Sequence, residues 1–249
     1  MKLLKTQSFE IAVNNTGDER ASRIAILLPG RLDTKDYINF VSHAEILAKK
    51  GFFVVAIDPP GTWDSPGDIN DYSTSMYMRA VNELIDYFGN RPTLLLGHSR
   101  GGAVAMLASF NPSVVGVVLI NAAYGYPSPP DPKLIENNAL PEYRDIPPGN
   151  VRTVEKRRFD LPLAYFEDGT KHDPASALAN FRGAKLLVHA TRDEFTPLDE
   201  VKEIFSTLSE PKMFLEIDCY HDYRLYPNEI ESVNNSLEHF VDKFMPVYF

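Results

Sequence analysis

The sequence predicts an α/β fold built on a doubly wound, mostly parallel sheet. Short runs that are apolar almost throughout recur along the 249 residues, as expected for strands buried on both faces of a parallel sheet. Segments with apolar residues at helical spacing lie between these runs. Alternation of strand and helix implies right-handed crossovers that place helices on both faces of one sheet. We therefore expect a single domain over residues 1–249.

Each expected strand is a short run rich in valine, isoleucine and leucine. The expected strands are residues 23–29, 52–58, 93–98, 114–121, 185–190 and 212–218. Four expected helices lie between or after them: one ends at Gly51, one spans 77–88 before Gly89, one follows Ser99, and one covers 230–244. Glycine is a common residue just past the end of a helix, which supports the first two boundaries.

Residues 122–183 interrupt this alternation. The segment is rich in proline and charge, has no buried-strand pattern and separates two predicted strands. It is too long for an ordinary connection. We expect a lid inserted between the sixth and seventh strands of the sheet rather than a second domain. Tyr124 and Tyr126, near its start, are expected at the mouth of a pocket as substrate contacts, with packing inside the lid as the alternative.

Composition narrows the function classes. The formal net charge is −9 and the pI is near 5.2, which argues against attraction to nucleic acid or to an anionic membrane. Cys219 is the one cysteine, so no internal disulfide can form. The N-terminal segment lacks the apolar core of a signal peptide, and no run reaches the roughly 20 apolar residues of a membrane span. We expect a cytoplasmic protein without a membrane span, and the sequence carries no signal for its oligomeric state.

The segment "GHSRGG" (97–102) has the G-x-S-x-G pattern of a nucleophile elbow. In that turn glycines allow a strained serine to stand between the end of a strand and the start of a helix. The helix N-terminus then offers N–H groups to a developing oxyanion. An apolar run precedes Ser99 and a helical run follows it, as the motif requires. The alternative is a serine that caps the helix in a loop that needs glycine.

A serine nucleophile needs a base, and the base needs an orienting acid. In this architecture they follow the serine in the order acid, then histidine, in loops after strand ends. Of the six histidines, only His221 lies after a late strand and before the last helix. Asp193 follows the preceding strand and is the expected acid. His98 is expected to point away from Ser99, while Glu194, Asp218 and Asp222 are expected as surface or supporting carboxylates.

Two backbone N–H groups should bind the oxyanion. One is that of Arg100, directly after the serine. The other should come from the turn after Pro29-Gly30, with Arg31 as the first candidate and Leu32 as the second. Leu32 is also a candidate substrate contact. We expect no metal and no organic cofactor, because candidate ligands lack metal spacing and no phosphate-binding glycine loop opens a helix.

Together these residues resemble the α/β-hydrolase superfamily over essentially the whole chain. The resemblance is carried by "LLPG" (27–30), "DPPGTWDSPG" (58–67), "GHSRGG" (97–102), "TRDEFTP" (191–197) and "YH" (220–221). It implies a serine hydrolase of the carboxylesterase, lipase or serine-aminopeptidase branch. We expect hydrolysis of a carboxylic ester, or of a thioester or small amide, through Ser99, His221 and Asp193. The alternatives are a serine aminopeptidase, a C–C bond hydrolase with the same triad, and a non-catalytic ligand-binding relative. Within the loop 58–67, Trp63 is expected to brace its own loop.

Overall fold

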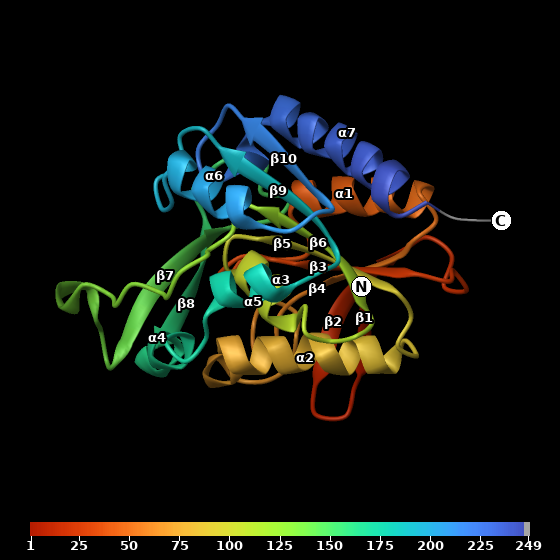
Figure 1. Cartoon of the computed structure of the whole chain (residues 1–249). Helices are drawn as coiled ribbons and strands as arrows, with labels where there is room; N and C mark the ends of the chain where they lie inside the picture. Colours follow the sequence, from red (N-terminus) through yellow and green to blue (C-terminus); the bar gives the residue numbers. More distant parts are fainter. Residues whose placement is uncertain (247–249) are drawn as a thin grey trace.

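An eight-stranded sheet forms the centre of the computed structural model, which describes residues 1–246 (Figure 1). The last three residues of the expected domain lie outside this range. The strands of the sheet run in the order β1-β2-β4-β3-β5-β6-β9-β10, and within this order all are parallel from β4 to β10. The strands are β1 (Lys2–Lys5), β2 (Glu10–Thr16), β3 (Ile24–Leu28), β4 (Phe53–Ile57), β5 (Thr93–His98), β6 (Val114–Ile120), β9 (Ala184–Ala190) and β10 (Lys212–Ile217). The last six correspond to the six expected strands.

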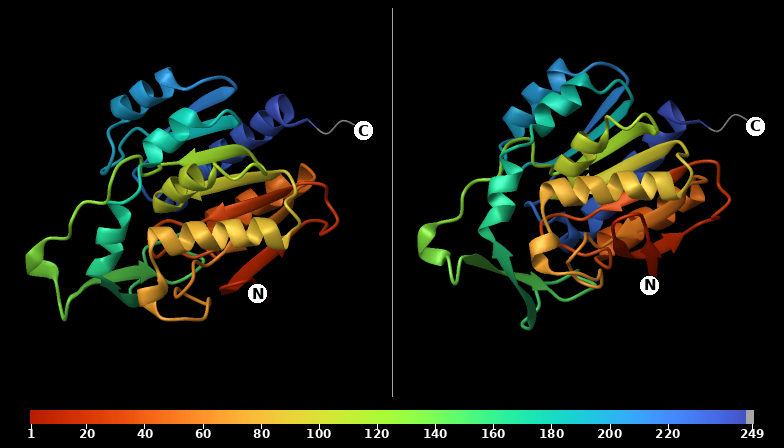
Figure 2. Two further views of the ribbon diagram at one scale, coloured as in Figure 1. Left: turned by 60° about the horizontal axis from the view of Figure 1, so that its bottom comes forward. Right: turned by 90° about the horizontal axis from the view of Figure 1, so that it is seen from below.

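Helices cover both faces of the sheet, so the doubly wound α/β fold is confirmed (Figures 1 and 2). One face carries α1 and α7, and the other carries α2, α3, α5 and α6. The helices are α1 (Ile38–Lys49), α2 (Thr74–Tyr87), α3 (Arg100–Ala108), α4 (Leu163–Gly169), α5 (Pro174–Asn180), α6 (Leu198–Thr207) and α7 (Pro227–Phe244). In the part of the chain that the structure describes, no helix combines the length and the hydropathy of a membrane span.

Three elements outside the insertion were not expected from the sequence. β1 and β2 form an antiparallel hairpin at the edge of the sheet, where exposed residues break the apolar run. Helix α6 was missed because it buries only Val201. Edge strands and surface helices bury too little side-chain area to leave the pattern by which core elements are recognised.

The long segment between β6 and β9 contains ordered structure of its own. It forms an antiparallel hairpin of β7 (Ala139–Asp145) and β8 (Lys156–Pro162), followed by α4 and α5. Figure 2 shows the hairpin projecting from one end of the sheet, beyond the layered helices. Helix α5 instead packs against α3 on the face of the sheet. The insertion therefore both extends over the strand ends and completes the helical layer.

The turn from β5 into α3 passes extremely close to its neighbours. A Cβ on Gly101 would lie 2.0 Å from the carbonyl oxygen of Leu28, and one on Gly97 would lie 2.3 Å from that of Gly101. Distances this short exclude any side chain at either position. The two glycines thus set the path by which β5 delivers Ser99 to the edge of the sheet.

A buried histidine connects α1 and α7, the two helices that share one face of the sheet. His43 of α1 donates from Nδ1 to Asn234 Oδ1 of α7 (2.7 Å), and its Nε2 accepts from the hydroxyl of Tyr223 (2.8 Å). Tyr223 also accepts a hydrogen bond from Asn39, so its own proton is free for His43. Burial lowers the pKa of His43 to about 4, because this environment solvates the neutral ring and not the imidazolium.

We predict that Gly101→Ala destabilises the fold by about 1–3 kcal/mol or more, because the added Cβ must displace the backbone of β3. Urea unfolding measures this directly. Gly125→Ala is the matched control, since a Cβ at Gly125 meets no atom within 4 Å. Equal unfolding midpoints for the two variants would show that the close approach at Gly101 is not a constraint.

We predict that stability falls as the pH drops from 7 to 5, in part because of His43. The unfolded chain takes up a proton near pH 6.5, whereas the folded chain resists it until about pH 4. The free energy of unfolding should therefore decrease by about 2 kcal/mol more in the wild type than in His43→Gln. Urea titrations at the two pH values give both numbers. Identical decreases would contradict a neutral, buried His43.

Candidate active site

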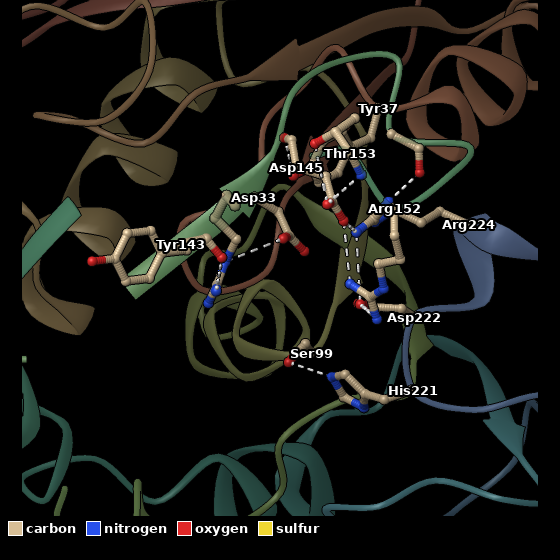
Figure 3. A network of polar contacts seen from close by, with 12 residues as sticks. Asp33, Tyr37, Ser99, Tyr143, Asp145, Arg152, Thr153, His221, Asp222 and Arg224 are labelled. Atoms are coloured by element: carbon tan, nitrogen blue, oxygen red, sulfur yellow. Dashed lines mark hydrogen bonds and ion pairs between the residues drawn. The ribbon is translucent and has the colours of Figure 1, made fainter. Parts of the chain in front are cut away.

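The three residues of the expected catalytic triad each follow the end of a strand. Ser99 follows β5, Asp193 follows β9 and His221 follows β10. All three strands are parallel, so their carboxyl ends lie along one edge of the sheet. The three residues, which are up to 122 positions apart in the chain, are in hydrogen-bond contact there. Figure 3 shows the contact between Ser99 and His221.

The contacts form a linear chain. His221 Nε2 lies 2.9 Å from Ser99 Oγ, and His221 Nδ1 lies 2.7 Å from Asp193 Oδ2. The second carboxylate oxygen of Asp193 accepts the backbone N–H groups of Phe195 (2.8 Å) and Thr196 (3.0 Å). Burial alone would raise the pKa of Asp193, but these hydrogen bonds and the charge of His221 hold that pKa below its usual value. An ionised Asp193 keeps the proton of His221 on Nδ1 and leaves Nε2 to accept from Ser99.

The backbone of Ser99 is strained. It has φ 52° and ψ −118°, in a region that non-glycine residues rarely adopt. Although Ser99 occupies the N-cap position of α3, its side chain makes no capping hydrogen bond. The hydroxyl points to His221 instead. The geometry therefore favours the nucleophile elbow over the capping serine.

The backbone N–H groups of Arg31 and Arg100, two residues that line the cavity together with Ser99, have no acceptor among residues 1–246. Arg100 begins α3, so its N–H has no partner within the helix. Leu32 differs from expectation. Its side chain is buried in the core, its N–H donates to the hydroxyl of Tyr72 (3.3 Å), and it does not line the cavity at Ser99. Leu32 is thus a packing residue, with neither a free N–H nor a surface for substrate.

Asp58 and Trp63 hold the loop that carries Arg31. Asp58 accepts from the hydroxyl of Thr34 (2.8 Å) and from the backbone N–H of Lys35 (2.9 Å). Trp63 donates from Nε1 to the carbonyl of Leu32 (2.8 Å), so it braces this loop as well as its own. The backbone of the loop is thereby positioned without any ligand.

Three carboxylates, those of Asp36, Asp58 and Asp64, converge as metal ligands would. The ammonium of Lys35 occupies the space between them, at 2.7–2.9 Å from each. Burial alone would lower the pKa of Lys35, but attraction to Asp58 and the three hydrogen bonds raise it. The ammonium offsets one of the three negative charges and fills the position that a metal ion would take, so we assign the cluster no metal.

Ser99 and His221 open onto a cavity of about 690 Å³, which strand β7 of the insertion also lines. Tyr124 and Tyr126, both expected near the pocket, line it. Tyr126 is exposed at its rim, whereas Tyr124 is buried and its hydroxyl has no partner within residues 1–246. Burial, with a smaller contribution from the charge of Asp193, raises the pKa of Tyr124, so this hydroxyl stays protonated.

Residues that hold His221 were not identified from the sequence. The side chain of His98 makes no hydrogen bond to Ser99. Its Nε2 lies 3.2 Å from the carbonyl oxygen of His221, and its Nδ1 lies 3.3 Å from Asp33 Oδ2. Asn121 donates to the same carbonyl from Nδ2 (2.9 Å). Burial alone would lower the pKa of His98, but the hydrogen bond and charge of Asp33 raise it. His98 and Asn121 together fix the backbone of His221.

Ion pairs connect the insertion to the loop after β10 (Figure 3). Arg224 binds Asp145 at 2.5 Å and also donates to the carbonyl of Gly149. Arg152 binds Asp222, the residue after His221, at 2.6 Å. Such pairs join segments 70 or more residues apart, and no local spacing in the sequence predicts them.

Comparison with known proteins agrees with this geometry. A model of the alpha/beta hydrolase family matches residues 25–231. Human serine hydrolase BPHL is 25% identical over 244 residues, covering 88% of this chain and 81% of that protein. Mouse palmitoyl-protein thioesterase ABHD10, mitochondrial, is 20% identical over 236 residues, covering 89% and 76%. Among solved structures, Est1E from Butyrivibrio proteoclasticus with bound ferulic acid has a TM-score of 0.76 at 15% identity, covering 98% of this chain and 99% of that one. The chain belongs to the alpha/beta hydrolase family.

Proposed function

We propose that the protein is a serine hydrolase that cleaves carboxylic esters through an acyl-enzyme. The observation that carries the proposal is the hydrogen-bonded chain from Asp193 through His221 to Ser99, with contacts of 2.7 and 2.9 Å. A serine hydroxyl is a weak nucleophile until an adjacent base removes its proton. This arrangement supplies that base in the tautomer it needs.

In the first half of the reaction, Ser99 Oγ attacks the carbonyl carbon while His221 Nε2 takes its proton. The negative charge of Asp193 stabilises the imidazolium that forms. The carbonyl oxygen becomes an oxyanion, which accepts hydrogen bonds from the N–H groups of Arg31 and Arg100. The tetrahedral intermediate collapses when His221 returns the proton to the leaving alcohol, and the acyl group stays on Ser99.

In the second half, His221 takes a proton from water and the resulting nucleophile attacks the acyl-enzyme. The same two N–H groups stabilise the second oxyanion. Collapse releases the acid and returns the proton to Ser99. Because the loop of Arg31 is held by Asp58 and Trp63, the donors need little rearrangement during either step.

The cavity favours a small, polar ester-like substrate. Its lining mixes charged residues with aromatic ones, which suits a short polar acyl group better than a long alkyl chain. Thioesters and small amides can use the same chemistry, and a mouse relative is named a palmitoyl-protein thioesterase. A serine aminopeptidase needs a carboxylate free to bind the substrate amine. Asp33, Glu142 and Asp145, which line this cavity, are already paired with basic side chains, and the lining carboxylates without an ion pair, Glu194 and Glu200, are exposed. Within residues 1–246 no buried lining carboxylate is free for an amine, which argues against that alternative.

A C–C bond hydrolase would use the same three residues and differs only in substrate. A purely ligand-binding protein has no use for a strained serine aligned with a histidine that an ionised aspartate orients, because strain of this kind costs about 1–3 kcal/mol. The cytoplasmic location expected from the sequence stays a prediction.

We predict that Ser99→Ala lowers kcat/KM for short 4-nitrophenyl esters by at least about 10³-fold, because no nucleophile remains. A fluorophosphonate probe should label the wild type at Ser99 and leave the variant unlabelled. Peptide mapping of the labelled protein identifies the modified residue. Label on another residue, or full activity of the variant, would remove Ser99 from the mechanism.

We predict that Asp193→Asn lowers kcat/KM by about 10³–10⁴-fold, since an amide can stabilise neither the imidazolium nor the required tautomer of His221. Steady-state kinetics on the same esters provide the measurement. Asp218→Asn is the control, because Asp218 is an exposed carboxylate that pairs with Arg192 and does not contact His221. A similar loss in both variants would point to the local fold rather than to the relay.

A further inference from the structure

Arg100 lies inside the cavity, directly after Ser99. It is the first residue of α3, only 7% of its surface is exposed, and it lines the same cavity as Ser99 and His221. Although the residue as a whole is buried, each of its side-chain nitrogen atoms keeps some exposed surface. The exposed part of its side chain therefore faces the space in which a substrate would bind.

The guanidinium of Arg100 has no partner among the residues that the structure describes. Within residues 1–246, no carboxylate lies within 4 Å of it and no group accepts a hydrogen bond from it. The other arginines nearby differ: Arg31 binds Glu142 at 2.9 Å, Arg144 binds Glu142 at 2.9 Å, and Arg224 binds Asp145 at 2.5 Å. Lys156 also lines the cavity, but it is exposed at the rim.

The acidic residues of the cavity do not neutralise Arg100. Glu142 lies between Arg31 and Arg144, and Asp33 faces His98 at 3.3 Å. Asp222 is bound to Arg152 and Glu194 accepts the backbone N–H of His221. Each of these carboxylates already has its counter-charge or donor, while Glu200, which also lines the cavity, is exposed and forms no ion pair with Arg100 within residues 1–246. Arg100 is thus a buried cation in the cavity lining, and no side chain around it within residues 1–246 neutralises its charge.

Burial of an unpaired guanidinium is costly, because the group loses water and retains five N–H donors without acceptors. An anion in the cavity removes that cost, since a planar carboxylate can accept two parallel hydrogen bonds from the guanidinium. The N-terminus of α3 adds a favourable field for negative charge at the same place.

We propose that Arg100 binds a carboxylate on the substrate, so that the preferred esters carry a negative charge close to the scissile bond. This inference rests on the proposed serine-hydrolase function and names its substrate class. Arg100 contributes its backbone N–H to the oxyanion and its side chain to the carboxylate. The two groups belong to one residue, so the carboxylate and the reacting carbonyl must be separated by only a short linker.

The test compares pairs of esters that differ only in charge. Monoethyl succinate and ethyl succinamate place a carboxylate or its neutral amide on the acyl side. O-acetylglycolate and O-acetylglycolamide do the same on the alcohol side. A pH-stat follows the hydrolysis of all four. We expect the wild type to prefer the carboxylate of at least one pair by about 10–100-fold in kcat/KM, the range of a charge-assisted hydrogen bond.

Variants then assign that preference to Arg100. Arg100→Gln should reduce the carboxylate-to-amide ratio to near one, and Arg100→Lys should keep part of it. Arg31→Gln is the matched control, because Arg31 lines the same cavity but is neutralised by Glu142; its ratio should stay close to that of the wild type. If the ratio persists in Arg100→Gln, or falls equally in Arg31→Gln, Arg100 is not the carboxylate site.

Two outcomes separate this inference from the function on which it rests. A wild type that hydrolyses both amides at least as fast as the matching carboxylates overturns the carboxylate site and leaves the hydrolase intact. If none of the four esters is hydrolysed, calorimetry with monoethyl succinate and Ser99→Ala protein tests binding alone. Binding that weakens at least 10-fold on adding Arg100→Gln supports the site, and unchanged or absent binding overturns it.

Discussion

The active site depends on one backbone constraint, the close passage of β5 into α3 around Ser99. Gly97 and Gly101 permit this passage because a Cβ at either position would lie within 2.3 Å of a backbone oxygen. The resulting turn forces Ser99 to φ 52°, directs its hydroxyl away from the helix and toward His221, and leaves the N–H of Arg100 without a partner. The proposed nucleophile, the proposed oxyanion donor and the side chain proposed to bind a carboxylate all belong to this single turn.

The loops that face this turn are held by polar contacts rather than by the apolar core. Asp58 fixes the loop of Arg31, while His98 and Asn121 fix the backbone of His221. The insertion joins the same system, since Arg144 donates from Nε to the carbonyl of Arg31 at 3.0 Å. Such support lets the donors of the site keep their positions before substrate arrives, which is what electrostatic preorganisation requires.

Sequence reasoning identified the elements whose signal is local. The strands β3, β4, β5, β6, β9 and β10 are largely apolar runs, and Ser99 carries its own motif. Asp193 and His221 could be proposed because chain order and strand ends restrict the choice. The β1–β2 hairpin, α6 and the partners of His98 could not, because edge pairing, shallow burial and ion pairs between distant segments leave no periodic pattern. Leu32 shows the same limit. Arg31 and Leu32 are neighbours in one turn, and the sequence does not indicate that the N–H of Leu32 donates to Tyr72 while that of Arg31 does not.

The proposed function depends above all on acyl transfer to Ser99. Rapid quenching during turnover of a 4-nitrophenyl ester, followed by mass spectrometry of the digested protein, tests it most directly. The account predicts that the peptide containing Ser99 gains the mass of the acyl group, and that this adduct accumulates in Asp193→Asn only slowly. Turnover without any acylated Ser99, or with the acyl group on another residue, would contradict it.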